Sequence, residues 1–158
     1  KLSQNMADNK QLLLFKIKDL SLAFPIEIVS KIIQSQEVSP SDDPTGLLKG
    51  VFNFHGVTTP LISLRNRFGL PPADINVDNL FIIIKRGDNN IAVIADEVIG
   101  LVTVDFSSDV KSAQEITSGI SRVDFMTGND SICFIYNSDT LLTNAESVQI
   151  NSFLSNVK

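Results

Sequence analysis

The sequence has very little of the residue types that usually carry catalysis, metal binding or disulfide bonds. Its 158 residues include one cysteine, Cys133, one histidine, His55, and no tryptophan. A single cysteine excludes an internal disulfide and fits a reducing compartment. Zinc sites normally take three or four His, Cys or carboxylate ligands. No such spacing occurs here, so we expect neither a metal nor a cofactor.

Signatures of an active site are missing as well. Cys133 lies within an apolar run, which predicts a buried, inert thiol and not a nucleophile paired with His55. No glycine loop of phosphate-binding type is present. The adjacent carboxylates Asp42-Asp43 and Asp96-Glu97 are typical of a solvated loop and of a cap on the next turn. The sequence therefore gives no basis for an enzyme.

Long apolar runs and an excess of positive charge are also absent. No wholly apolar run exceeds five residues, far below the ~20 that cross a bilayer, and residues 1–10 lack a signal-peptide core. The net charge is −5 with scattered basic residues, which disfavours nucleic-acid binding. We expect a protein partner and no membrane insertion. The chain does not begin with Met, which favours a piece of a longer protein.

What the sequence does contain is an internal repeat. When the sequence is aligned with itself at an offset of 69 residues, without gaps, the same pattern occurs twice. The pattern is a strand, a polar turn, a second strand and an acidic turn. Such self-similarity indicates architecture, and it predicts two modules over residues 10–77 and 78–142. Matched pairs include Phe15 with Ile84, Ala23 with Ala92, Ile32 with Leu101, and Gly50 with Gly119.

Short strands dominate both modules. Residues 12–17 and 20–24 flank a turn at Lys18-Asp19, and residues 80–85 and 90–95 flank "RGDNN". Residues 100–106 alternate, with Val102, Val104 and Phe106 on one face. A further hairpin is expected where residues 121–127 and 131–137 flank "GND". Short strands at this spacing predict an all-β protein of small closed barrels.

Helical signals are few. Residues 25–32 are compatible with two helical turns that begin at Pro25. Residues 143–158 predict a C-terminal helix, because Thr143 and Glu146 form a capping-box pattern and the apolar residues after them follow helical spacing. We expect that helix to lie on one of the barrels.

The segment "LLKGVFNFHGVTTPLISLRNRFGL" (47–70) resembles the signature of the CheW-like domain family. Two further segments resemble family motifs: residues 22–33, with Val29 in place, and residues 79–104, with Asp96 and Val98 in place. The resemblance covers roughly residues 10–145. The matched positions in the first segment are Lys49, Gly50, Val51, Asn53, Gly56, Pro60, Leu64 and Arg65.

This resemblance implies two five-stranded SH3-like barrels packed together, with short helices and a C-terminal helix. It implies a non-catalytic adaptor in the cytoplasm that couples chemoreceptor cytoplasmic tips to the regulatory domain of a histidine kinase. It is associated with the receptor arrays only through protein partners, which include other CheW-like domains. The receptor-binding groove implied by the family would hold Val29, Gly50, Asn53, His55, Gly56 and Arg65, while Asp96 and Val98 form a second-barrel motif.

Three departures from the family pattern predict a different partner set. His55 replaces an Arg, Ser63 replaces an Asp, and Asn137 ends a segment that usually closes with Asp. The usual Arg and Asp could have formed an ion pair that stabilises the groove. Two alternatives stay open: a CheW-like domain of a larger array-organising or polar-localisation protein, and a small-ligand sensor that binds between the barrels.

Two arginines and two glycines leave a choice between structure and binding. Arg65 and Arg67 could clamp a carboxylate or phosphate, or could be exposed solubilising charge. Gly50 and Gly56 allow a close backbone approach or a bend that a β-carbon would block. At Gly50 we expect the approach of a partner.

Overall fold

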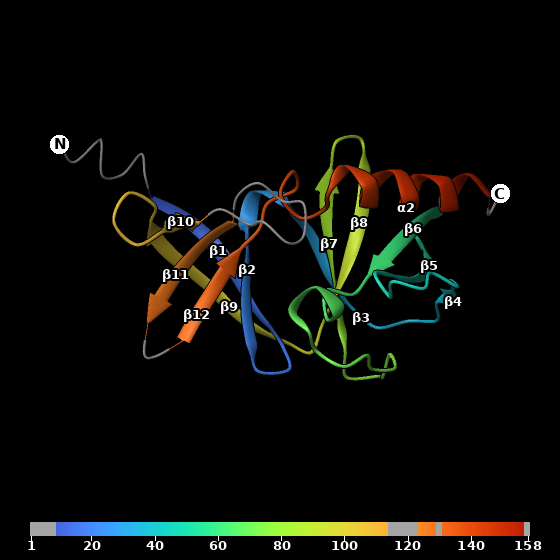
Figure 1. Cartoon of the computed structure of the whole chain (residues 1–158), viewed down its shortest axis with the longest axis horizontal. Helices are drawn as coiled ribbons and strands as arrows, with labels where there is room; N and C mark the ends of the chain where they lie inside the picture. Colours follow the sequence, from blue (N-terminus) through green and yellow to red (C-terminus); the bar gives the residue numbers. More distant parts are fainter. Residues whose placement is uncertain (1–8, 114–122, 129–130, 157–158) are drawn as a thin grey trace.

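The structure, a computed structural model, describes residues 9–113, 123–128 and 131–156 as two six-stranded sheets and one C-terminal helix (Figure 1). We call the sheets barrel A and barrel B. Barrel A contains β1 (Asn9–Ile17), β2 (Leu20–Pro25), β9 (Glu97–Asp105), β10 (Lys111–Ala113), β11 (Val123–Gly128) and β12 (Ser131–Ile135). Barrel B contains β3 (Val29–Gln34), β4 (Ser39–Pro40), β5 (Leu48–Phe54), β6 (Val57–Ile62), β7 (Leu80–Arg86) and β8 (Asn89–Ala95).

The two sheets have the same strand order. Barrel A runs β10-β11-β12-β2-β1-β9, and barrel B runs β4-β5-β6-β8-β7-β3. In each, one neighbouring pair is parallel, β12 with β2 and β6 with β8, while the others are antiparallel. The all-β fold of two SH3-like barrels is therefore confirmed, and the 69-residue repeat describes a real structural equivalence. Each sheet has five strands of five or more residues and one short edge strand, β4 or β10.

The predicted boundary near residue 77 does not separate the two barrels. β1 and β2 belong to barrel A, the chain then builds the whole of barrel B, and it returns to barrel A with β9. Each barrel thus completes its sheet with strands from the other repeat: β9 pairs with β1, and β3 pairs with β7. The sequence offset revealed the equivalence, but pairing between distant strands is decided only by tertiary packing.

The predicted hairpins form as expected, with one correction to the helices. Lys18 takes a positive φ of 55° in the turn between β1 and β2. β11 pairs with β12, although part of the connecting "GND" turn lies outside the described residues. The expected helix at 25–32 is reduced to one 3₁₀ turn, η1 (Ile26–Ile28), because Val29 begins β3 and pairs with Ile84.

Three apolar clusters hold the fold together. Leu12, Ala23, Val104, Cys133 and Ile135 fill barrel A, while Phe52, Leu61, Phe81, Ile83 and Ala92 fill barrel B. The third and largest cluster joins the barrels, with Phe15 and Phe24 from barrel A and Ile82 and Val93 from barrel B. Since each buried large apolar side chain contributes roughly 1.5–3 kcal/mol, this shared cluster makes the barrels one body.

The C-terminal helix α2 (Asn144–Asn156) follows the last strand of barrel A but lies along barrel B (Figure 1). Ile150 is buried in the shared cluster, and Phe153 and Leu154 pack against it. The predicted capping box is confirmed: Thr143 N–H donates to Glu146 Oε1 at 2.9 Å, and Glu146 N–H donates to Thr143 Oγ1 at 3.1 Å. No helix in the described part of the chain is long and apolar enough to span a membrane.

Candidate partner-binding site

Arg65 and Asp96, which come from two separate family motifs, meet in an ion pair. Arg65 Nη2 lies 2.8 Å from Asp96 Oδ2, and the two side chains are 16% and 30% exposed. Arg65 Nη1 also donates to the Pro71 carbonyl at 3.2 Å. Arg65 is therefore committed to contacts within the chain and is not an open clamp for an external carboxylate.

Asp96 connects the two barrels. It stands between β8 of barrel B and β9 of barrel A, and its N–H donates to the Lys16 carbonyl at 2.9 Å. Its carboxylate also accepts from Lys18 N–H at 2.7 Å and from Asn79 Nδ2 at 3.2 Å. The β1–β2 turn, the segment before β7 and Arg65 all meet on this one carboxylate, so Asp96 holds the barrels in register.

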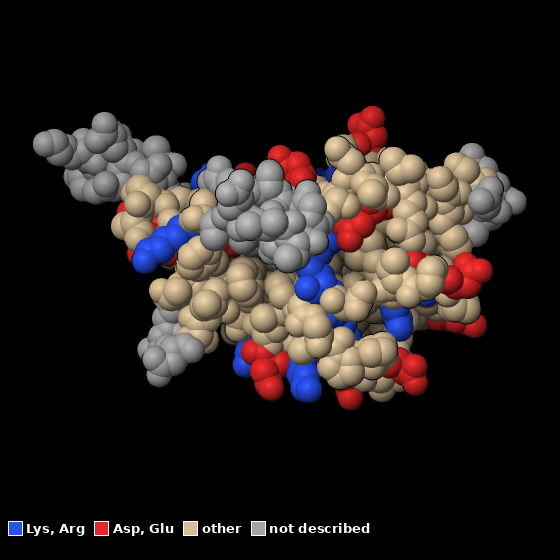
Figure 2. All heavy atoms as spheres, viewed as in Figure 1, with Lys and Arg blue, Asp and Glu red and all other residues tan. Residues whose placement is uncertain are grey.

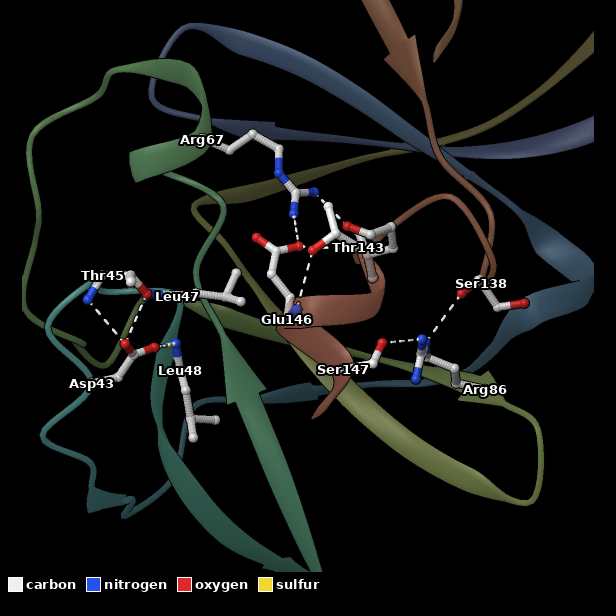
Figure 3. A network of polar contacts seen from close by, with 11 residues as sticks. Asp43, Thr45, Leu47, Leu48, Arg67, Arg86, Ser138, Thr143, Glu146 and Ser147 are labelled. Carbon is white, nitrogen blue, oxygen red and sulfur yellow. Dashed lines mark hydrogen bonds and ion pairs between the residues drawn. The ribbon is translucent and has the colours of Figure 1, made fainter. Parts of the chain in front are cut away.

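Arg67 makes the corresponding attachment for α2 (Figure 3). Its guanidinium lies 2.7 Å from Glu146 Oε1, donates to the Leu141 carbonyl, and is 7% exposed. The oxygen that caps the helix is thus also the oxygen that binds Arg67. The expectation of exposed charge is wrong at Arg67, as is a clamp for an external anion.

A second arginine attaches the other side of the same helix (Figure 3). Arg86, at the end of β7, donates through Nε to the Ser138 carbonyl at 3.3 Å and through Nη2 to Ser147 Oγ at 2.5 Å. Together, Arg67 and Arg86 join α2 and the segment before it to barrel B. No sequence pattern indicated Arg86, because its partners lie more than 50 positions away.

Gly50 is a position of close backbone approach, but the approach comes from within the chain. It is buried in β5 and pairs with Pro40 of β4. A β-carbon at Gly50 would lie 2.1 Å from the Ser39 carbonyl oxygen and 2.7 Å from Val38 Cγ1. The close approach at Gly50 is therefore made by β4, and a partner contact at this position stays a prediction.

Asn53, His55 and Gly56 form the exposed tip of the β5–β6 hairpin. His55 and Gly56 have φ values of 53° and 83°, and Gly56 N–H donates to Asn53 Oδ1 at 2.9 Å. Two successive positive φ values are typical of a type I′ turn, where Asn-Gly is the favoured pair. The His55 ring packs edge-on against Phe54, with centroids 4.2 Å apart. Gly56 is thus a turn glycine and not a strand bulge.

Positions 55 and 63 stand at opposite ends of β6. The strand between them has six residues, which separates its ends by roughly 20 Å. An Arg at 55 and an Asp at 63 could not form an ion pair on this backbone. Ser63 itself is buried, and its N–H donates to the Leu47 carbonyl at 2.8 Å.

Val29 and Val98 are both partly buried against the cluster between the barrels. They occupy equivalent places, at the start of β3 and near the start of β9, and each lies beside a register shift in its ladder. Their packing accounts for their presence in the motifs without a partner. The predicted receptor groove therefore divides into buried Gly50, partly buried Val29 and Arg65, and the exposed hairpin tip.

The remaining polar candidates have structural surroundings. Asp43 accepts from Thr45 N–H and Leu48 N–H, both at 2.9 Å. Burial raises its pKa, but these hydrogen bonds outweigh it and hold the pKa below its usual value. Burial raises the pKa of the Cys133 thiol to about 11. Among the described residues, no group of three or more His, Cys, Asp or Glu is placed to hold a metal ion.

Sequence reasoning missed two exposed apolar residues at equivalent positions. Ile32 on β3 is 37% exposed and Leu101 on β9 is 57% exposed, and the two are 69 residues apart. Their strands are the end strands of the two sheets. On the face shown in Figure 2, acidic and basic side chains are interspersed among other residues. The repeat alignment already paired Ile32 with Leu101 but gave no sign of their exposure.

These features define a class of protein: a rigid pair of SH3-like barrels with a related apolar edge on each. The comparisons with known proteins agree. The family model described as CheW-like domain matches residues 11–146, and the chain belongs to that family.

Named relatives support the assignment. The chain is 30% identical over 106 residues to the chemotaxis protein CheW of Bacillus subtilis (strain 168), covering 67% of each chain. It is 26% identical over 140 residues to the chemotaxis protein CheW of Helicobacter pylori, covering 85% of this chain and 84% of the relative. The solved scaffolding protein TtCheW from Thermoanaerobacter tengcongensis has the same fold, with a TM-score of 0.67 at 18% identity, over 80% of this chain and 82% of that one.

Proposed function

We propose that this chain is a non-catalytic adaptor that couples chemoreceptor cytoplasmic tips to the regulatory domain of a chemotaxis histidine kinase. Membership of the CheW-like family supports the general role. The observation that carries the coupling role is the pair of equivalent edges, Ile32 on barrel B and Leu101 on barrel A. A coupling protein needs two partner surfaces on one rigid body, and the repeat supplies one on each barrel.

Exposed apolar side chains on end strands are unusual in a protein without partners. Natural sheets protect such strands with charge, proline or bulges, because an unpaired apolar edge recruits other chains. Ile99 and Leu101 are 51% and 57% exposed on the same strand. Burial of these side chains on a partner would remove that liability and contribute binding energy.

The exposed hairpin tip is proposed as a determinant of partner choice on barrel B. His55 offers one hydrogen-bond donor when neutral, whereas an Arg would offer a planar fork to a carboxylate. A receptor tip that binds at this position needs an apolar or singly hydrogen-bonding contact instead of a paired carboxylate. Such a partner would act in the cytoplasm, at the arrays.

Binding assays with isolated receptor tips and isolated kinase regulatory domain test the proposal. We expect Ile32→Ser and Leu101→Ser each to weaken at least one of the two complexes tenfold or more. Val148→Ser removes an equally apolar side chain that is 64% exposed on α2, and it is the matched control with unchanged affinity. Absence of binding to both partners by the unaltered chain would overturn the coupling role.

A further inference from the structure

The two barrels are filled by different side chains. In barrel B, Phe52, Phe81 and Ile83 are at most 4% exposed. The Phe52 and Phe81 rings pack together with centroids 5.2 Å apart. Barrel B is therefore closed by its own aromatic side chains.

Equivalent positions in barrel A carry no aromatic ring. The 69-residue offset places Leu12 at the position of Phe81. The strand pairings place Met126 at the position of Phe52, because Met126 lies opposite Cys133 and Phe52 lies opposite Thr59 in matching hairpins. Both hairpins adjoin equivalent strands, with Ile135 beside Ala23 and Leu61 beside Ala92. Two phenyl rings in one barrel thus correspond to Leu and Met in the other.

A hollow of about 620 Å³ opens in barrel A beside Met126, while Leu12 is buried in the core and does not line it. Its volume lies within the range of small-molecule sites, roughly 300–1,000 Å³. The walls are mostly apolar and come from β1, β2, β9, β11 and β12. The apolar lining residues are Leu14, Phe15, Ile99, Val102, Met126 and Cys133, and the polar ones are Lys16, Ser21, Thr127 and Ser131.

The rim carries little net charge. Lys16 lies directly opposite Glu97 in the β1–β9 ladder, so the two charges largely offset each other. A strongly charged ligand gains little at such a rim, whereas apolar contact with Leu14, Val102 and Met126 is available to a ring.

We propose that this hollow binds a small, uncharged aromatic molecule of one to three rings, which packs beside Met126 where Phe52 packs in barrel B. The site opens at the surface of barrel A and shares Ile99 with the partner edge proposed above. The probe assays use the chain without partners, so their outcome does not depend on the coupling role. The apolar side chains that would contact the ring come from different strands, Met126 from β11 and Val102 from β9.

Fluorescence titration with the neutral probe N-phenyl-1-naphthylamine tests the site, because its emission rises in apolar surroundings. We expect saturable binding to the whole chain. Met126→Phe fills the hollow as barrel B is filled and should weaken probe binding at least tenfold. Val102→Phe fills the hollow from β9, and it replaces Met126→Phe as the test variant if Met126→Phe does not fold. Thermal unfolding confirms that each variant is folded.

Two further measurements separate the hollow from the outer surface. Ile132→Ser is the matched control, since Ile132 is 47% exposed beside Cys133 on the same strand and successive residues face opposite sides. It should change probe affinity less than twofold. Saturating probe should also slow alkylation of Cys133 at least fivefold. No saturable binding, equal affinity in the folded filling variants, or unchanged alkylation would each overturn the site.

Discussion

Arg65 and Asp96 are 31 positions apart in the sequence, yet Arg65 Nη2 and Asp96 Oδ2 are 2.8 Å apart in the fold. Their ion pair lies where the chain passes from barrel B back to barrel A, and the same carboxylate accepts from Lys18 N–H. Arg65, expected in the receptor groove, and Asp96, expected in the second-barrel motif, therefore together fix the relative orientation of the barrels.

Asp96→Asn should lower the free energy of unfolding by about 1–3 kcal/mol. The amide keeps the size of the side chain but removes the charge that Arg65 and Lys18 N–H face, and a half-buried cation loses its counter-charge. Urea unfolding measures the change. Asp88→Asn, in an exposed turn, is the control and should change stability by less than ~0.5 kcal/mol. Equal effects of the two substitutions would contradict the proposed clamp.

Gly50→Ala should destabilise the chain by about 3 kcal/mol, because the new β-carbon would meet the Ser39 carbonyl oxygen and one strand must move. Gly56→Ala is the comparison. It adds the same atom where nothing lies within 4 Å but φ is +83°, which costs roughly 1–2 kcal/mol. Thermal or urea unfolding of both variants distinguishes steric overlap from backbone strain. A smaller loss at Gly50 than at Gly56 would exclude the overlap.

Arg67 and Glu146 should show a coupling free energy of about 1–2 kcal/mol in a double-mutant cycle. Arg67 is almost fully buried and Glu146 also caps α2, so removal of either partner leaves the other incompletely paired. Arg67→Ala, Glu146→Gln and the double variant complete the cycle, and Gln retains the capping ability. Additive effects would show that the Arg67–Glu146 pair does not contribute to the attachment of the helix.

The stability of the 43–48 loop should depend on pH through Asp43. Its pKa in the folded chain is lower than its usual value, so the ionised carboxylate favours the folded state. This contribution is fully present above the unfolded pKa, near 3.8, and is lost as the pH falls through the folded pKa. Asp43→Asn should flatten the acid side of the stability profile. An identical profile for the variant would show that Asp43 does not contribute.

Cys133 should react slowly with thiol reagents while the chain is folded. With a pKa of about 11 against an ordinary value of 9.0, the thiolate fraction at pH 8 falls roughly a hundredfold. Alkylation rates measured in buffer and in denaturant compare the two states. The folded rate should also rise steeply between pH 8 and 11. A folded rate close to the denatured rate would show that the thiol is accessible and ionised.

The sequence alone determined the elements whose causes are local. Alternating and continuous apolar runs predicted the hairpins, Thr143 and Glu146 predicted the helix start, and the 69-residue offset predicted two equivalent units. These signals succeed because turn geometry, capping and side-chain alternation depend on neighbours within a few residues.

Tertiary structure alone decided how those elements pair and which of their side chains meet. It paired β9 with β1 and β3 with β7 across the repeats, joined Arg65 to Asp96 and Arg67 to Glu146, and placed Ser39 against Gly50. These contacts join residues from different elements. Neither the composition nor the spacing of residues in the sequence predicts how close two such elements lie in the fold. Exposure of Ile32 and Leu101 is decided in the same way, because a strand pattern shows which residues share a face but not which face is covered.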